Sequence, residues 1–241
     1  MTESTTPTVV LVHGAFADAA SWSGVIAELQ QHGVPVVAPP NPLRGLASDA
    51  AYVASVAAQI DGPVVLVGHS YGGAIITVAG ATENVVGLVY VAAYVLEEGE
   101  SLGELQGRFP EPPLGSSLRQ AAYPVEGAEP AVELTIAPEM FPQVFAADVP
   151  GEVTKVLAVA QRPLAARAFT ETASTAAWKT KPSWVVVSDA DQAINPEVQR
   201  FGAKRAGAAA VEVAGASHAV AMSRPKEVAD VIREAVRATS A

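Results

Sequence analysis

Short, continuously apolar runs alternate with amphipathic stretches along the first 96 residues and again after residue 180. Strands buried on both faces have this continuous pattern, whereas half-exposed strands alternate between apolar and polar residues. The strands that this pattern predicts span residues 8–12, 35–38, 64–67, 86–91, 183–187 and 211–213. The chain is therefore expected to form an α/β fold, with a mostly parallel central sheet and helices on both faces.

Between these runs, apolar residues recur at helical spacing. One helix is expected from Ser21 or Ser23, either of which can cap it, to about His32, where Gly33 stops it. A second helix is expected over residues 48–60, and two more near the end of the chain, over residues 198–205 and 223–236. These helices provide the cover that both faces of the sheet need.

The pattern changes between residues 97 and 180. Proline and glycine become frequent, helical stretches are limited to residues near 153–160 and 163–173, and no strand is evident. We predict a core formed by residues 1–96 and 181–241, and a mostly helical lid insertion over residues 97–180.

One apolar run stops abruptly at Gly68-His69-Ser70-Tyr71-Gly72. This is a G-x-S-x-G pattern at the point where a strand turns into a helix, and it is typical of a nucleophile elbow. Such a turn holds the serine in strained backbone angles and needs small residues around it, which Gly68 and Gly72 provide. Ser70 is therefore the candidate nucleophile.

A serine nucleophile needs a general base, and the chain has four histidines. His69 lies too close to Ser70 along the chain to turn back on it, and His32 is expected at a helix end. His13 belongs to the loop after the first strand. His218 remains, in a loop between the last strand and the last helix, and such loops gather at the carboxyl edge of a parallel sheet. His218 is therefore the candidate base.

The base needs an acid to hold its tautomer, and two aspartates follow the strand over residues 183–187. Asp191 is favoured, because Asp189 lies at the strand end, where it can cap the turn instead. The chain order of serine, aspartate and histidine is the one expected with this elbow. Asp189 stays an alternative, as does Glu97 or Glu98 after the preceding strand.

Acyl transfer to a serine also needs N–H donors for the developing oxyanion. One is expected from Tyr71, the residue after the nucleophile. The other is expected from Ala15, because the first strand ends at His13-Gly14 and the loop can then curl toward the serine. His13 is expected to organise this loop by hydrogen bonding, and Phe16 to form a wall of the pocket.

Composition narrows the possible functions. The formal net charge of −10 disfavours nucleic acid and anionic membrane surfaces as partners. The chain has no cysteine, no H-E-x-x-H motif and no G-x-G-x-x-G after a strand, so no metal and no cofactor are expected. The segment Met1–Pro7 has neither a basic nor an apolar leader region, and no apolar run is long enough to span a membrane, so a cytoplasmic location is expected.

Taken together, these motifs resemble the α/β-hydrolase fold superfamily, and among its members the small serine esterases related to plant methylesterases and hydroxynitrile lyases. The resemblance covers nearly the whole chain and is weakest in the lid. It implies Ser70 as nucleophile, His218 as base, Asp191 as acid, and Ala15 and Tyr71 as oxyanion donors. Hydroxynitrile lyases of this branch have a lysine after the catalytic histidine, whereas Ala219 follows His218 here, so lyase activity is not expected.

The expected function is hydrolysis of small to medium apolar or aryl carboxylic esters, with lactones as a further substrate class. Cofactor-free perhydrolysis or haloperoxidase-type chemistry uses the same residues and stays an alternative, as do C–C bond hydrolysis and a non-hydrolytic small-molecule receptor on this fold. The oligomeric state is left open. The predicted pocket walls are aromatic: Phe16, Trp22, Phe109, Phe141, Phe145 and Trp178, with Tyr71 beside the serine.

Overall fold

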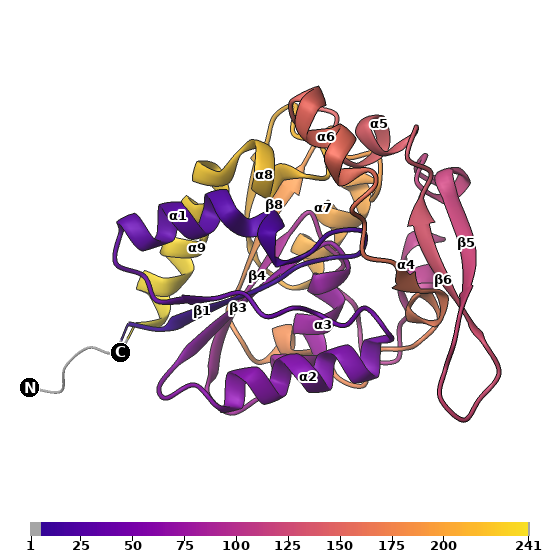
Figure 1. Cartoon of the computed structure of the whole chain (residues 1–241). Coiled ribbons are helices and arrows are strands. Elements are labelled where there is room, and N and C mark those ends of the chain that lie inside the picture. The colour runs from indigo at the N-terminus through magenta and orange to yellow at the C-terminus, as the bar shows by residue number, and fades with distance from the viewer. Residues whose placement is uncertain (1–5, 241) are drawn as a thin grey trace, which may run out of the picture.

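A six-stranded parallel sheet forms the centre of the molecule in the computed structural model, which describes residues 6–240 (Figure 1). The prediction of a mostly parallel sheet is confirmed. The expectation that the chain starts without a leader segment falls mainly on residues 1–5 and lies outside the described residues. In spatial order the strands are β2 (Val36–Val37), β1 (Thr8–Val12), β3 (Val64–His69), β4 (Val85–Val91), β8 (Ser183–Ser188) and β9 (Ala209–Val213).

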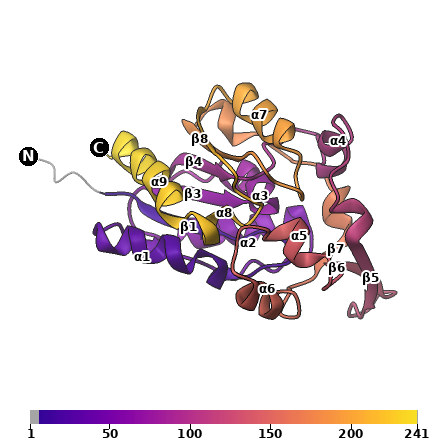
Figure 2. The same cartoon turned by 90° about the horizontal axis from the view of Figure 1, so that it is seen from above.

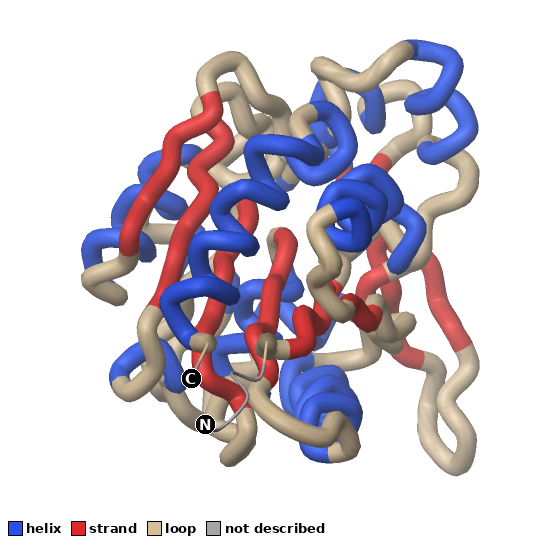
Figure 3. The backbone as a smooth tube through the Cα atoms, turned by 90° about the vertical axis from the view of Figure 1, so that its left-hand side faces the viewer, coloured by secondary structure: helices blue, strands red, loops and turns tan. Residues whose placement is uncertain are grey.

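Helices cover both faces of this sheet (Figure 3). One face packs against α1 (Ser23–Gln31), α8 (Val220–Ser223) and α9 (Pro225–Thr239). The other face packs against α2 (Leu46–Ala58), α3 (Tyr71–Ala79) and α7 (Pro196–Arg205).

Successive strand residues divide between these two cores. Val9 and Leu11 of β1 point to the α1 side, whereas Val10 and Val12 point to the α3 side, and all four are fully buried. Fully burying one such side chain contributes about 1.5–3 kcal/mol relative to leaving it exposed. The continuous apolar runs of the sequence follow from this two-sided burial.

The first helix begins differently from the sequence prediction. A short 3-10 helix (Ala19–Trp22) precedes α1, and its cap is Asp18, whose carboxylate accepts from the Ala20 N–H at 2.8 Å. The hydroxyls of Ser21 and Ser23 instead donate to the carbonyls of Asp18 and Ala20. The predicted serine cap is therefore wrong, because a third polar residue upstream starts the helical turn earlier.

The segment between β4 and β8 contains a second, antiparallel sheet. Its strands are β5 (Leu118–Tyr123), β6 (Ala131–Ile136) and β7 (Leu164–Ala165), accompanied by the helices α4 (Leu102–Gln106), α5 (Phe141–Phe145) and α6 (Gly151–Leu157). The β5–β6 hairpin stands apart from the central strands (Figure 3). The expectation that residues 97–180 lack strands is wrong, while the domain boundaries themselves stay a prediction. Across residues 6–240, no helix is long and apolar enough to cross a lipid bilayer.

Candidate active site

Ser70 lies at the turn between β3 and α3, with backbone angles (φ 56°, ψ −121°) that residues other than glycine rarely adopt. The Ser70 N–H donates to the Val91 carbonyl of β4 at 3.1 Å, and the Ser70 carbonyl accepts from the Gly73 N–H at 3.0 Å. A Cβ atom at Gly68 would lie 2.4 Å from the Gly72 carbonyl oxygen. The strained turn therefore depends on neighbours that have no side chain.

Substitution of Gly72 tests whether the turn depends on glycine. A Cβ atom there would lie 2.4 Å from the Val12 carbonyl oxygen, a backbone atom that cannot move without shifting β1. We expect Gly72→Ala to lower the free energy of unfolding by more than about 3 kcal/mol in urea titrations. Gly151→Ala, where a Cβ atom meets nothing within 4 Å, is the control and is expected to stay within about 1 kcal/mol of the wild type. Equal stability of the two variants would show that β1 yields easily.

Two backbone N–H groups beside Ser70, those of Ala15 and Tyr71, find no hydrogen-bond acceptor among residues 6–240. Tyr71 opens α3, and the first N–H groups of a helix have no acceptor within the helix. Both residues are buried. Buried N–H groups without a partner are rare, so an oxygen atom bound at this place would gain two donors. The N–H of the next residue, Phe16, already donates to the Arg162 carbonyl at 3.1 Å.

His13 holds the loop that presents Ala15. Its Nε2 accepts from the Asn41 N–H at 2.9 Å, so the ring proton lies on Nδ1, which donates to the Gly14 carbonyl at 2.9 Å. Burial lowers the pKa of His13 and keeps the ring neutral. A Cβ atom at Gly14 would lie 2.7 Å from Ser70 Cβ, so this loop lies directly against the serine.

His218 and Asp191 form a buried pair, with His218 Nδ1 at 2.7 Å from Asp191 Oδ2. A carboxylate can only accept here, so the Nδ1 atom carries the ring proton and Nε2 is left as the basic atom. The structure thus pairs His218 with Asp191. Asp189 is exposed and accepts from the Gly215 N–H at 2.6 Å, which stabilises the loop without reaching the ring.

Both oxygen atoms of the Asp191 carboxylate accept hydrogen bonds. Its Oδ1 accepts from the N–H groups of Ala193 (2.7 Å) and Ile194 (2.9 Å), and its Oδ2 also accepts from Gln199 Nε2 (2.8 Å). Gln199, fully buried on α7, in turn accepts from the Ser188 N–H at 2.9 Å. Gln199 therefore ties the carboxylate to the end of β8. Sequence reasoning missed it, because a glutamine on an amphipathic helix is normally exposed.

His69 connects the serine turn to the His218 loop. Its Nε2 donates to the His218 carbonyl at 2.8 Å, and the two ring centroids are 4.7 Å apart. Burial lowers the pKa of His69 to about 3, so the ring stays neutral. No hydrogen bond within residues 6–240 joins the Ser70 hydroxyl to the His218 ring, and such bonds often tighten only when substrate binds. Sequence reasoning set His69 aside as a base, and its structural link to His218 was missed.

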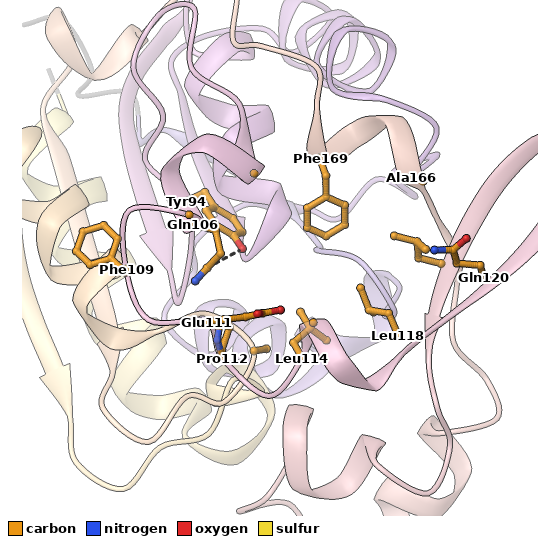
Figure 4. A pocket seen from close by; sticks show the side chains of 15 residues that line it. Tyr94, Gln106, Phe109, Glu111, Pro112, Leu114, Leu118, Gln120, Ala166 and Phe169 are labelled. Carbon is orange, nitrogen blue, oxygen red and sulfur yellow. Dashed lines mark hydrogen bonds between the residues drawn. The ribbon is translucent and has the colours of Figure 1, made fainter.

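A cavity of about 670 Å³ is lined mostly by residues of the insertion (Figure 4), and Ser70, His218 and Asp191 are not among its lining residues. Tyr94 and Ala193 connect it to the site: the Tyr94 N–H donates to the Ser70 carbonyl at 3.4 Å, and the Ala193 N–H to Asp191. Polar side chains in the wall are those of Tyr94, Gln106, Glu111 and Gln120. The apolar walls come from Phe109, Pro112, Leu114, Leu118, Leu134, Ala166 and Phe169.

A smaller cavity of about 150 Å³ lies against Phe16, Phe141 and Phe145. Of the aromatic residues predicted to form pocket walls, these three line the smaller cavity and Phe109 lines the larger one.

Trp22 and Trp178 line neither of these two cavities, and their predicted place in the pocket walls stays a prediction. Trp22 is fully buried behind the serine turn, with its ring centroid 6.2 Å from that of His69. Trp178 Nε1 donates to the Leu96 carbonyl at 2.7 Å. The Tyr71 side chain also turns into the core, where its hydroxyl donates to Asp49 at 2.8 Å.

Within residues 6–240, no group of three or more His, Asp or Glu side chains is arranged to hold a metal ion.

Comparisons with known proteins agree with this fold. The model of the alpha/beta hydrolase family matches residues 9–231 of the sequence. No curated protein matches the chain. Three similar solved structures are polyneuridine aldehyde esterase, a pyrethroid hydrolase from Sphingobium faniae JZ-2 and a methylesterase from Arabidopsis.

The three structures share the whole fold at low sequence identity. Polyneuridine aldehyde esterase is 21% identical, with a TM-score of 0.81 over 95% of this chain and 99% of that chain. The pyrethroid hydrolase is 24% identical, with a TM-score of 0.76 over 97% and 98% of the two chains. The methylesterase is 18% identical, with a TM-score of 0.77 over 96% and 99%.

Proposed function

We propose that this chain, which belongs to the alpha/beta hydrolase family, is a serine hydrolase that cleaves carboxylic esters of small molecules. The observation that carries the proposal is the buried His218–Asp191 pair, whose hydrogen-bonding atoms are 2.7 Å apart. The loop of His218 is in turn hydrogen-bonded by His69, the residue before Ser70. Ester substrates are also the class to which the names of the similar solved structures point: an esterase, a methylesterase and a hydrolase of pyrethroids.

The proposed reaction proceeds through an acyl-enzyme. Ser70 Oγ attacks the ester carbonyl carbon while its proton passes to His218 Nε2. The carbonyl oxygen, now negatively charged, accepts hydrogen bonds from the N–H groups of Ala15 and Tyr71. The imidazolium of His218, stabilised by the Asp191 carboxylate, then gives its proton to the leaving alkoxide. A water molecule, deprotonated by the same Nε2 atom, attacks the acyl-enzyme carbonyl carbon. The imidazolium then returns this proton to Ser70 Oγ as the bond to the acyl group breaks and the carboxylic acid leaves.

The larger cavity favours substrates with an apolar body. Its volume of about 670 Å³ lies in the range of ordinary small-molecule sites, and most of its lining side chains are apolar. We therefore propose small to medium alkyl or aryl esters as substrates, and lactones of similar size.

Turnover of a p-nitrophenyl ester series with increasing acyl length tests this proposal. We expect hydrolysis of short and medium chains, a decline once the acyl group exceeds the cavity, and covalent labelling of Ser70 by an organophosphonate, mapped by mass spectrometry. Absence of turnover on every ester together with absence of labelling would refute the proposal.

Gln106 adds an expectation about substrate polarity. Tyr94 O–H donates to Gln106 Oε1 at 3.2 Å, while the buried Gln106 Nε2 has no hydrogen-bond partner within residues 6–240 (Figure 4). Burial raises the pKa of Tyr94, which stays a neutral donor and fixes the orientation of the amide. An unpaired buried donor is unfavourable, so a substrate oxygen that reaches it from the cavity gains a hydrogen bond.

We expect Gln106→Leu to remove a preference for esters that carry an ether or keto oxygen over matched esters with a methylene group. The ratio of kcat/KM for the oxygen-containing ester to kcat/KM for its methylene analogue should fall about tenfold, which corresponds to the loss of one hydrogen bond. Gln120→Leu, at an exposed amide of the same cavity, is the control. Equal preferences in the wild type and Gln106→Leu would show that the amide does not contact substrate.

A further inference from the structure

The insertion contacts the loop of His218 through Phe145 and Asp148. The Ala219 N–H donates at 2.9 Å to the carbonyl of Phe145, the last residue of α5. The ring of Phe145 lies edge-on to the His218 ring, with the centroids 5.0 Å apart. Seen from above, α5 lies beside α8, the helix that follows His218 (Figure 2).

Asp148 makes the second contact, in the connection between α5 and α6. The Ser217 hydroxyl, on the residue before His218, donates to Asp148 Oδ1. Arg224 Nη1 lies 3.6 Å from Asp148 Oδ2. The Asp148 side chain is 16% exposed and Ser217 is 3% exposed. A largely buried carboxylate is costly unless it is paired, so Ser217 on the His218 loop and Arg224 just after α8 both stabilise it.

The loop needs such external support. Residues 214–219 form no helix or strand, and Gly215 adopts a φ of 70°, so the backbone there lacks the regular hydrogen bonds that fix an element. The Asp191 hydrogen bond fixes the tautomer and one atom of the ring. The position of the whole imidazole relative to Ser70 still depends on where the loop backbone lies.

We propose that Asp148, together with Phe145, positions His218, so that the insertion places the general base in line with Ser70. Neither residue takes part in the reaction itself; both act through the His218 loop. This inference rests on the proposed function, because it assigns a partner to the base of that reaction. It also makes the 145–148 segment a fixed part of the site, whatever the rest of the insertion does.

Steady-state kinetics of four variants test the inference. We expect Asp148→Ala and Ser217→Ala each to lower kcat by roughly 10- to 100-fold with little change in KM, because a small misplacement of a reacting group has an effect of this size. The double variant should be no worse than the worse single variant, since both remove the same hydrogen bond. Asp148→Asn should recover most of the loss, because its amide oxygen still accepts from Ser217.

Glu152→Ala is the matched control, at an exposed carboxylate on α6. Wild-type kcat in Asp148→Ala, a loss of thermal stability alone, or additive losses in the double variant would each overturn the positioning role. Failure of the proposed function is recognised separately, by turnover that does not depend on Ser70.

The NMR resonance of the His218 ring, in protein with isotope-labelled histidine, is a readout that does not depend on turnover. The chain has only four histidines. We expect this resonance to shift or broaden in Asp148→Ala and to stay unchanged in Glu152→Ala. An unchanged His218 resonance in Asp148→Ala would overturn the inference even if no ester were hydrolysed.

Discussion

Replacing Ser70 by alanine is expected to lower kcat for a p-nitrophenyl ester by a factor on the order of 10⁶, since the nucleophile of an acyl-enzyme mechanism is removed. The fold should remain. The Ser70 hydroxyl makes no hydrogen bond within residues 6–240, and alanine keeps the backbone contacts to Val91 and Gly73. The unfolding free energy should therefore change by less than about 1 kcal/mol.

Stopped-flow and steady-state assays on the same preparation measure this loss. Ser55→Ala, at an exposed serine of α2, is the control and should keep wild-type turnover. A Ser70→Ala protein that retains more than about 1% of wild-type kcat and is folded would contradict the nucleophile assignment, because the residual catalysis of such variants is far lower.

Asp191→Asn is expected to lower kcat by about 10⁴-fold, because the amide would present N–H to His218 Nδ1 and move the ring proton to Nε2. An imidazole with its proton on Nε2 cannot accept the proton of Ser70. The amide nitrogen would also face the Nε2 donor of Gln199, which now contacts the same carboxylate oxygen at 2.8 Å. We therefore expect reduced thermal stability in addition to the kinetic loss.

Asp189→Asn provides the matched comparison two residues earlier. Its side-chain oxygen can still accept from the Gly215 N–H, so kcat should stay within about twofold of the wild type, as for most surface substitutions. A larger loss of kcat in Asp189→Asn than in Asp191→Asn would instead identify Asp189 as the acid, the alternative that the sequence left open.

The parts of the fold that are specified by short stretches of sequence could be predicted from the sequence alone. The elbow needs glycines at fixed positions within five residues, and most strands of the central sheet are continuously apolar runs, so both are evident in the sequence. The hairpin is different. Most of β5 is exposed, and its residues Arg119-Gln-Ala-Ala122 carry no alternation of apolar and polar side chains. Strand β6 does alternate, with Leu134 and Ile136 buried, but prolines on both sides favoured a loop.

Support for the site comes from single polar side chains on other elements, and this is why it was not predicted. Gln199 reaches Asp191 over 8 positions, from the start of α7, and Asp148 reaches Ser217 over 69 positions. An isolated glutamine or aspartate is most often a solvated side chain. Only the packing of α5, α7 and the carboxyl ends of the strands gives these two residues a partner.

The turn of the β5–β6 hairpin offers a practical handle for observing the insertion. Residues 124–130 are all exposed, and the hairpin extends away from the central sheet (Figure 1). Because the natural sequence contains no cysteine, a thiol placed at Ala128 would be unique and would accept a fluorophore or a solid support at one defined position. Such a probe would report on the hairpin by fluorescence while the 145–148 segment and the serine stay unmodified.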